Sequence, residues 1–160
     1  MNWEAIGAIA ELLSGVGVLA TLIYLAMQIR QNTDSVKESN YRNQTDRSIE
    51  HSRFVSGTPG MMSIYHRGMS SYTELTQEER WQFGTYMFSM FLDFQEGYHL
   101  HVRGRSEGTY WKSMKYNIFF YLSKHGGRAW WNSQGSKMLN EEFVNFVNSH
   151  LGAEKSANDT

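Results

Sequence analysis

Apolar residues fill one early stretch of the chain without interruption. No charged residue occurs in the 18 positions between Glu11 and Arg30. A helix rises about 1.5 Å per residue, so a bilayer core about 30 Å thick needs roughly 20 such residues. We therefore predict a transmembrane anchor within residues 1–30, with Glu11 near its outer boundary. The alternative is a helix buried in a soluble bundle, because the stretch is short and Glu11 adjoins it.

The residues that flank this stretch predict an uncleaved anchor and its orientation. The first eleven residues, MNWEAIGAIAE, contain no basic side chain, and no small-residue cleavage site follows the apolar stretch, so a cleaved export signal is disfavoured. Basic residues come only after it, at Arg30, Lys37, Arg42 and Arg47. Because basic residues stay on the cytoplasmic side, we expect the N-terminus outside and the remaining chain in the cytoplasm.

Small residues form a narrow stripe along this predicted helix. At roughly 100° per residue, five of them share one side. They are Gly7, Ala10, Ser14, Gly17 and Thr21. A small-residue stripe lets two helix backbones approach closely in lipid. The pattern predicts self-association or docking onto another membrane protein, although small residues also occur in membrane spans by chance.

Helical periodicity continues through the rest of the chain, which predicts an all-α protein. We expect the transmembrane helix to continue into a long polar helix, a stalk at residues 31–56 that packs one edge on the bundle. The sequence GTPG then breaks the chain, and residues 57–151 form a compact bundle of about four or five helices. Thr76 and Glu79 have the spacing of a capping box at a helix start. Residues 152–160 are predicted to be a disordered tail.

The bundle helices are predicted from faces of apolar residues at helical spacing. One helix has two such faces and is therefore expected to lie at the centre. Its first face is Phe83, Met87, Met90, Phe91, Phe94 and Tyr98, and its second is Trp81, Phe88 and Leu92. The following helices present Trp111, Met114, Ile118 and Leu122, and then Phe143, Phe146 and Val147. Between them, Gly126 and Gly127 are expected to terminate a helix as its C-cap.

Composition and charge remove several functional classes. The chain has no cysteine, which excludes disulfides, thiolate metal sites and a cysteine nucleophile. The formal net charge is -1, and basic residues are dispersed among acids, so we predict no nucleic-acid partner. The expected partners are the lipid bilayer and a second copy of the chain or another membrane protein.

Three short motifs contain residue types that could carry chemistry. Glu96 and His99 have the E-x-x-H spacing of di-iron bundles, but no second copy of the motif occurs, so a polar seam is favoured over a metal. His101 falls on the apolar face and is predicted to be a core histidine. The sequence KHGGR, residues 124–128, is read as a helix stop rather than an anion site. We predict no catalytic residue, cofactor or metal, which favours a protein that is not an enzyme.

Adjacent indoles occur at Trp130 and Trp131. On a helix they point roughly 100° apart, so at most one is expected to be fully buried. The other is predicted either to cover the edge of the domain or to form a protein interface.

Three segments of the chain together resemble those of a group of uncharacterised bacterial proteins. The segments are WEAIGAIAELLSGVGVLATLIYLAMQIRQNT, LTQEERWQF and GGRAWWNSQGSKMLNEEFVNFVNSHL. This group has one N-terminal transmembrane helix and a C-terminal helical domain. The resemblance implies a bacterial, single-pass inner-membrane protein, and it implies no active site.

Three functions are consistent with these patterns. The first is a non-enzymatic, membrane-anchored helical module that self-associates or serves as an accessory subunit of a membrane complex. The second is a sensor whose bundle encloses a small apolar ligand, which requires a cavity. The third is a metal-dependent enzyme built around Glu96 and His99, which the missing ligands disfavour.

Overall fold

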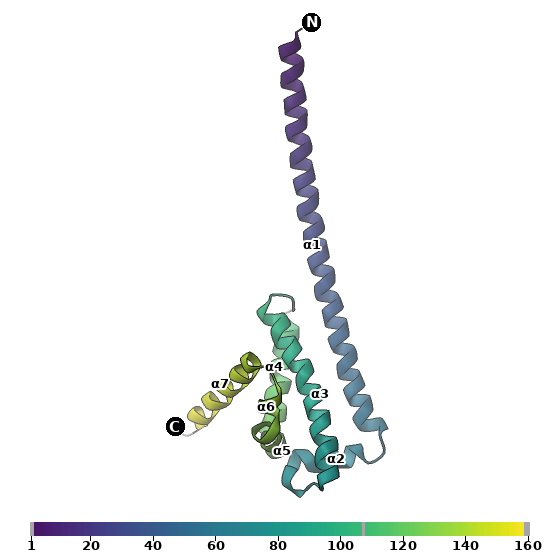
Figure 1. Cartoon of the computed structure of the whole chain (residues 1–160), viewed down its shortest axis with the longest axis vertical. Coiled ribbons are helices and arrows are strands. Elements are labelled where there is room, and N and C mark those ends of the chain that lie inside the picture. Colours follow the sequence, from purple (N-terminus) through teal and green to yellow (C-terminus); the bar gives the residue numbers. More distant parts are fainter. Residues whose placement is uncertain (1, 107, 159–160) are drawn as a thin grey trace. The chain divides into compact units, whose positions relative to one another are not determined.

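The computed structural model describes residues 2–106 and 108–158, and within them it is all-α (Figure 1). The structure is 91% helical, with no strand in the described residues, which confirms the predicted fold class. In chain order the elements are α1 (Trp3–Gly57), α2 (Met61–Ser70), the 3-10 helix η1 (Tyr72–Glu74), α3 (Gln77–Val102), α4 (Gly108–Ser123), α5 (His125–Trp130), the π-helix η2 (Trp131–Gly135), α6 (Ser136–Met138) and α7 (Glu141–Asn158).

The chain divides into two compact units, Met1–Ser39 and Asn40–Thr160. Helix α1 is continuous through the division, which confirms that the apolar helix continues without a break into the polar helix at residues 31–56. Its last part, from Asn40 to Gly57, belongs with the bundle. The unit boundary, after Ser39, therefore lies about two and a half helical turns beyond the predicted end of the anchor at residue 30.

The first unit contains the apolar part of α1. An 18-residue window of this helix has a mean hydropathy of 2.0, and none of the window is buried. By length and composition α1 can therefore cross a membrane. The Ser14 hydroxyl donates to the Ala10 carbonyl at 2.8 Å, and the Thr21 hydroxyl donates to the Gly17 carbonyl at 2.9 Å. Both hydroxyls are thus satisfied inside the helix, as a lipid environment requires.

The core of the second unit is built from the predicted faces of α3, α4 and α7. Its fully enclosed side chains include Phe83, Met87 and Phe91 from α3, Ile118 and Leu122 from α4, and Phe143 and Val147 from α7. The second apolar face of α3 is different, because Trp81 is 71% exposed and Leu92 is 39% exposed. Phe88 of the same face is half-buried and packs against the core, so α3 lies at the centre of the bundle, in contact with α2, α4 and α7, and only part of its second face is open.

Helix α3 begins with the predicted capping box. The Thr76 hydroxyl accepts from the Glu79 backbone N–H at 3.3 Å, and the Glu79 carboxylate accepts from the Thr76 N–H at 2.9 Å. The same carboxylate pairs with Arg67 of α2. The hydrogen bonds from Arg67 and from the Thr76 backbone lower the pKa of Glu79 to about 2. One side chain therefore caps α3 and ties it to α2.

Gly126 and Gly127 do not form a C-cap, which corrects the sequence interpretation. Helix α4 ends before them at Ser123, and both glycines are buried inside α5. A Cβ atom at Gly126 would lie 1.6 Å from the Gly68 carbonyl oxygen, and one at Gly127 would lie 2.1 Å from the Tyr121 carbonyl oxygen. Their role is to let α5 approach the backbones of α2 and α4.

The last helix is longer than predicted. Helix α7 runs to Asn158, so the predicted disordered tail is wrong for residues 152–158, where the backbone is helical. Residues after Leu151 are mostly good helix formers, and no proline stops the helix. Residues 159–160 lie outside the described residues.

Candidate functional site

The part of α1 that belongs to the bundle faces it with polar side chains. Residues spaced three or four apart fall on one side of a helix. On this side Gln44 is buried, Arg47 and His51 are half-buried, and Val55 is the one buried apolar residue among the described residues from 40 to 57. A helix would ordinarily present apolar residues at such positions. The polar character of this face therefore marks it as a candidate site.

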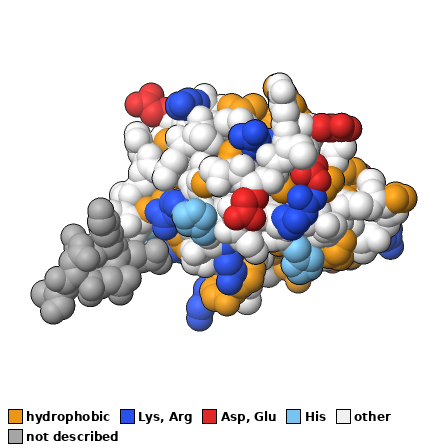
Figure 2. All heavy atoms as spheres, turned by 90° about the horizontal axis from the view of Figure 1, so that it is seen from below, with side chains coloured by type: hydrophobic (Ala, Val, Ile, Leu, Met, Phe, Trp, Pro, Cys, Tyr) orange, Lys and Arg blue, Asp and Glu red, His pale blue; other side chains and the backbone are white. Residues whose placement is uncertain are grey.

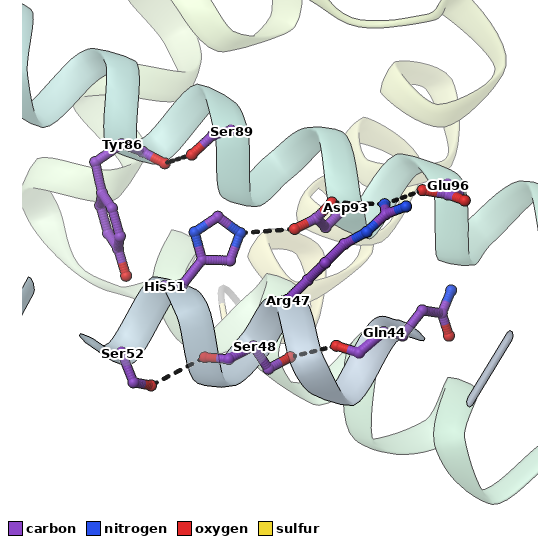
Figure 3. A network of polar contacts seen from close by, with 9 residues as sticks. All are labelled: Gln44, Arg47, Ser48, His51, Ser52, Tyr86, Ser89, Asp93 and Glu96. Atoms are coloured by element: carbon purple, nitrogen blue, oxygen red, sulfur yellow. Dashed lines mark hydrogen bonds and ion pairs between the residues drawn. The ribbon is translucent and has the colours of Figure 1, made fainter. Parts of the chain in front are cut away.

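Arg47 and His51 both reach Asp93, which lies on α3 (Figure 3). Arg47 Nη1 donates to Asp93 Oδ1 at 3.0 Å and also pairs with Glu96, one helical turn further along α3. His51 Nε2 lies 2.6 Å from Asp93 Oδ2. An ionised carboxylate only accepts hydrogen bonds, so His51 is the donor. Both oxygens of Asp93 are therefore engaged by α1.

The charge of Asp93 is stabilised by these two partners. Burial alone would raise the pKa of Asp93, but the hydrogen bonds from His51 and Arg47 outweigh it, and its pKa lies below the ordinary value. Hydrogen bonds from Glu96 and Asp93 in turn raise the pKa of Arg47. Both groups are charged at neutral pH, so the contact between α1 and α3 is a charge-assisted network.

A hollow lies on each side of this network. One is an open groove of about 900 Å³ whose lining includes Phe54, Trp81 and Leu92. The other is a smaller recess of about 200 Å³ between α1, α3 and α4. The smaller recess will be called the inner cavity, and its lining includes Gln44, Tyr86, Met90, Asp93, Phe94, Tyr110, Met114, Asn117 and Tyr121.

Tyrosine hydroxyls of the inner cavity stay protonated at neutral pH. Burial, reinforced by Tyr121, raises the pKa of Tyr86. Burial, reinforced by the charge of Asp93, raises the pKa of Tyr110 to about 12. Each of these hydroxyls can therefore donate a hydrogen bond.

The Gln44 side chain ends in an unsatisfied donor. Gln44 is only 5% exposed, yet its Nε2 finds no hydrogen-bond acceptor among residues 2–106 and 108–158. Nearly all buried polar groups in folded proteins have a partner, and leaving one unpaired costs about 1–3 kcal/mol. Figure 3 shows the Gln44 amide extending from α1 beyond the Arg47–Asp93 network. The Nε2 atom itself is enclosed by protein atoms beside Gly97 of α3, so it is an unpaired donor inside the contact between α1 and the bundle and does not open into the cavity.

The predicted helix-packing stripe lies apart from this site, in the first unit. Gly7, Ala10, Ser14, Gly17 and Thr21 are all exposed along α1. A Cβ atom at Gly7 or Gly17 would meet nothing within 4 Å. The stripe is thus open surface on this chain, and its role in helix packing remains a prediction.

Both indoles of the tryptophan pair are buried, so the prediction that at most one is enclosed is wrong. Trp130 is 0% exposed and Trp131 is 1% exposed. The ring of Phe91 packs against both, with centroid distances of 5.1 and 5.5 Å. Trp131 Nε1 donates to Asn148 Oδ1 of α7 at 3.0 Å. The pair belongs to the core and does not form an exposed interface, because side chains of α3 and α7, among them Phe91 and Phe143, pack on it.

The residues of the E-x-x-H motif contact different helices. Glu96 pairs with Arg47 of α1, whereas His99 Nδ1 lies 3.9 Å from Glu142 of α7. No group of three or more His, Asp or Glu side chains that could hold a metal occurs in the described part of the chain. His101 is exposed and stacks on Trp111 with ring centroids 4.8 Å apart, so the prediction of a core histidine is wrong.

The anion-binding alternative for residues 124–128 is also not supported by the geometry. The backbones of Gly126 and Gly127 are inside α5 and buried against other backbones. Arg128 Nε donates to the Leu122 carbonyl at 3.0 Å, and the Lys124 ammonium lies 4.8 Å from the Phe120 ring centroid. This segment therefore packs against the core as a helix and does not form a loop that could surround an anion.

Charges of both signs are mixed on the molecular face drawn in Figure 2. Lysine and arginine side chains alternate there with aspartate and glutamate, and small apolar areas lie between them. On that face neither sign gathers into one large patch. Comparison of the chain with family models, curated proteins and solved structures found no match.

Proposed function

We propose that this protein is a non-enzymatic, membrane-anchored helical module. Its first unit spans the inner membrane of a bacterium once, with the N-terminus outside and the bundle in the cytoplasm. It acts by associating with a second copy, or as an accessory subunit of a membrane complex. The observation that carries the proposal is the 18-residue apolar window of α1, none of which is buried by the rest of the described chain.

Exposure of that window to water would be costly. Leu12, Leu19 and Ile23 are between 61% and 70% exposed. Burial of one such side chain in an apolar environment is favourable by about 1.5–3 kcal/mol, so a window of this length favours lipid strongly. The basic residues that follow the window support the proposed orientation.

Association is supported by the surface of the same helix. The stripe from Gly7 to Thr21 consists of small side chains. Its two hydroxyls, of Ser14 and Thr21, already donate to backbone carbonyls of the same helix. Close approach of a second helix therefore leaves no hydroxyl unpaired. Van der Waals contact along such a stripe is what drives helix association in lipid.

A topology assay tests the anchor. Each terminus of the full chain is fused in turn to one of two reporters. Alkaline phosphatase is active only outside the cytoplasm, and green fluorescent protein fluoresces only inside it. We expect phosphatase activity at the N-terminus, fluorescence at the C-terminus, and retention of the chain in membranes after alkaline extraction. Release of the chain by alkaline extraction would contradict the anchor, and reversed reporter signals would contradict the orientation.

A further inference from the structure

We propose that the open groove between α1 and α3 is a docking site for a basic amphipathic helix of a partner protein. The groove has a volume of about 900 Å³, and every residue that lines it belongs to the second unit. Docking there therefore goes beyond the proposed anchor and does not require the first unit to lie in a membrane.

Large apolar side chains are exposed along this groove. Trp81 is 71% exposed, Phe54 is 48% exposed and Leu92 is 39% exposed, and all three belong to the lining. Single exposed apolar residues are ordinary on a protein surface, whereas several that gather around one hollow mark a surface that another molecule covers. Tryptophan is also enriched among the residues that dominate the binding energy of interfaces. The apolar lining therefore favours a protein partner.

The shape of the groove suits a helix. Arg47 contacts Asp93, whereas Phe54, further along α1, stacks on Tyr86, which comes earlier in α3, so the two helices run antiparallel beside the groove. The α3 side of the lining runs from Trp81 to Asp93, which at about 1.5 Å per residue is roughly 18 Å, or about three helical turns. Amphipathic helices bind in such grooves through apolar residues that recur on one face over two to three turns.

Small residues form the middle of the α3 side. Thr85 and Ser89 lie between Trp81 and Leu92 at helical spacing, and both line the groove. Their short side chains leave room for an apolar side chain of the partner between two large ones. The Ser89 hydroxyl donates to the Tyr86 carbonyl at 3.0 Å, so a partner can cover it without leaving this donor unpaired.

The charges around the groove favour a basic partner. The charged and titratable residues of the lining are Arg47, Glu50, His51 and Asp93, and Arg47 also pairs with Glu96. The three carboxylates exceed the guanidinium and the imidazole in number, so the acidic excess persists whether or not His51 is protonated. Asp93 and Glu96 are bound by the basic residues of α1, whereas Glu50 forms no ion pair within residues 2–106 and 108–158.

The unpaired carboxylate of Glu50 defines what the partner must carry. A lysine or arginine beside the apolar face of the docked helix would lie opposite this carboxylate, whereas an acidic helix would be repelled. The partner is thus a helix of about three turns with apolar residues on one face and basic residues along its edge.

Two synthetic peptides of about 14 residues test the inference. Both carry leucine at helical spacing on one face, and the remaining positions are lysine in one peptide and glutamate in the other. Each is labelled and titrated with the full chain in a nonionic amphipol, with the amphipol alone as the blank, and binding is measured by fluorescence anisotropy. We expect the lysine peptide to bind with a Kd on the order of 10 μM and the glutamate peptide to bind at least about tenfold more weakly.

A benzophenone group at the centre of the leucine face locates the bound peptide. After irradiation, mass spectrometry identifies the residues of the chain that are crosslinked. We expect crosslinks within residues 47–59 and 81–93, which include the lining of the groove.

Trp81→Ala should weaken binding of the lysine peptide at least about tenfold, because it removes the most exposed aromatic ring of the groove. Tyr116→Ala is the matched control, because Tyr116 is 69% exposed on α4 and does not line the groove. It should leave binding unchanged. Both side chains are exposed, so both variants should keep the melting temperature of the wild type.

Glu50→Lys tests the choice of a basic partner. It should abolish the preference for the lysine peptide over the glutamate peptide, because the carboxylate is replaced by a cation. Glu141→Lys, at an exposed position of α7, makes the same change of charge away from the groove and should leave the preference intact.

Three outcomes would overturn the inference. The first is binding of the lysine peptide that does not exceed the amphipol blank. The second is unchanged binding in a folded Trp81→Ala protein, or crosslinks that lie outside the two groove segments. The third is equal binding of the two peptides by the wild-type chain.

Discussion

His51 Nε2 and Asp93 Oδ2 lie 2.6 Å apart and join α1 to α3 across 42 positions of sequence. Arg47 holds the other oxygen of the same carboxylate at 3.0 Å. Asp93 is therefore the residue on which the bundle part of α1 converges. Removal of its charge should loosen that helix while leaving the apolar core of α3, α4 and α7 in place.

Asp93→Asn should lower the stability of the protein at neutral pH by about 2 kcal/mol, because two charge-assisted hydrogen bonds are weakened. The folded-state pKa of Asp93 lies below its ordinary value of 3.8, so the carboxylate's contribution is complete above that value. It is lost as the pH falls through the lower folded-state pKa. Thermal unfolding of the full chain in detergent, followed by circular dichroism from pH 7 to 2, measures this. The difference between wild type and variant should shrink below about pH 4.

Asp46→Asn is the control for this measurement, because Asp46 is an exposed carboxylate on the same stretch of α1. It should change the melting temperature little at any pH. An Asp93→Asn protein that melts like wild type at pH 7 would show that the network contributes nothing to stability.

Gly126→Ala should destabilise the bundle by about 3 kcal/mol. The added Cβ would lie 1.6 Å from the carbonyl oxygen of Gly68, and a backbone atom cannot move aside as a flexible side chain does. Gly152→Ala is the matched control, because a Cβ there meets nothing within 4 Å and the position is helical. Alanine at that position should raise stability by up to about 1 kcal/mol. Urea denaturation measures both, and equal effects of the two substitutions would refute the close approach of α5 to α2.

Glu79→Gln should destabilise the start of α3, because the carboxylate both caps the helix and pairs with Arg67. The pKa of Glu79 falls from 4.5 to about 2, so its contribution is complete above pH 4.5 and is lost as the pH falls through 2. Amide hydrogen exchange at residues 77–80 is the measurement, and exchange should accelerate in the variant. Glu78→Gln, at an exposed position in the same helical turn, should change exchange less. Equal acceleration in both variants would indicate that only the helix dipole matters.

Gly17→Leu should weaken self-association of the first unit, because a bulky side chain holds two helix backbones apart. Gly15→Leu introduces the same side chain two residues away and off the stripe. Crosslinking of the full chain in membranes should therefore give fewer dimers with Gly17→Leu and an unchanged yield with Gly15→Leu. A monomeric wild-type chain, or equal yields in all three proteins, would contradict packing through the stripe.

Features of the fold that depend on local sequence could be predicted. The faces of α4 and of one side of α3 follow from apolar spacing, and the Thr76–Glu79 capping box follows from residue type and separation. Hydrophobic periodicity, however, does not report what covers a face. Trp81 therefore has the spacing of a core residue on the second face of α3, although it is 71% exposed.

The candidate site could not be found in this way, because its residues are polar and distant in sequence. His51 and Asp93 become neighbours only when α1 lies against α3. One signal was present: Gln44, Arg47 and His51 recur at intervals of three and four residues in a helix that is predicted to pack one edge on the bundle. Gly126 and Gly127 of α5 have a role other than the predicted C-cap for a related reason. The close approach of two backbones involves segments distant in the sequence, so it leaves no pattern within either segment alone.

The polar face of α1 has a thermodynamic consequence. Exposure of apolar surface raises the heat capacity of a protein, whereas exposure of polar surface lowers it slightly. This part of α1 places an amide, a guanidinium and an imidazole against the bundle, and beside them Val55 and the rings of Tyr41 and Phe54, which lie 5.5 Å from Tyr110 and 6.2 Å from Tyr86. Separation of residues 40–57 from the bundle therefore exposes polar and apolar surface together, so their opposite heat-capacity contributions partly cancel, and salt and acid act in addition on the charged contacts.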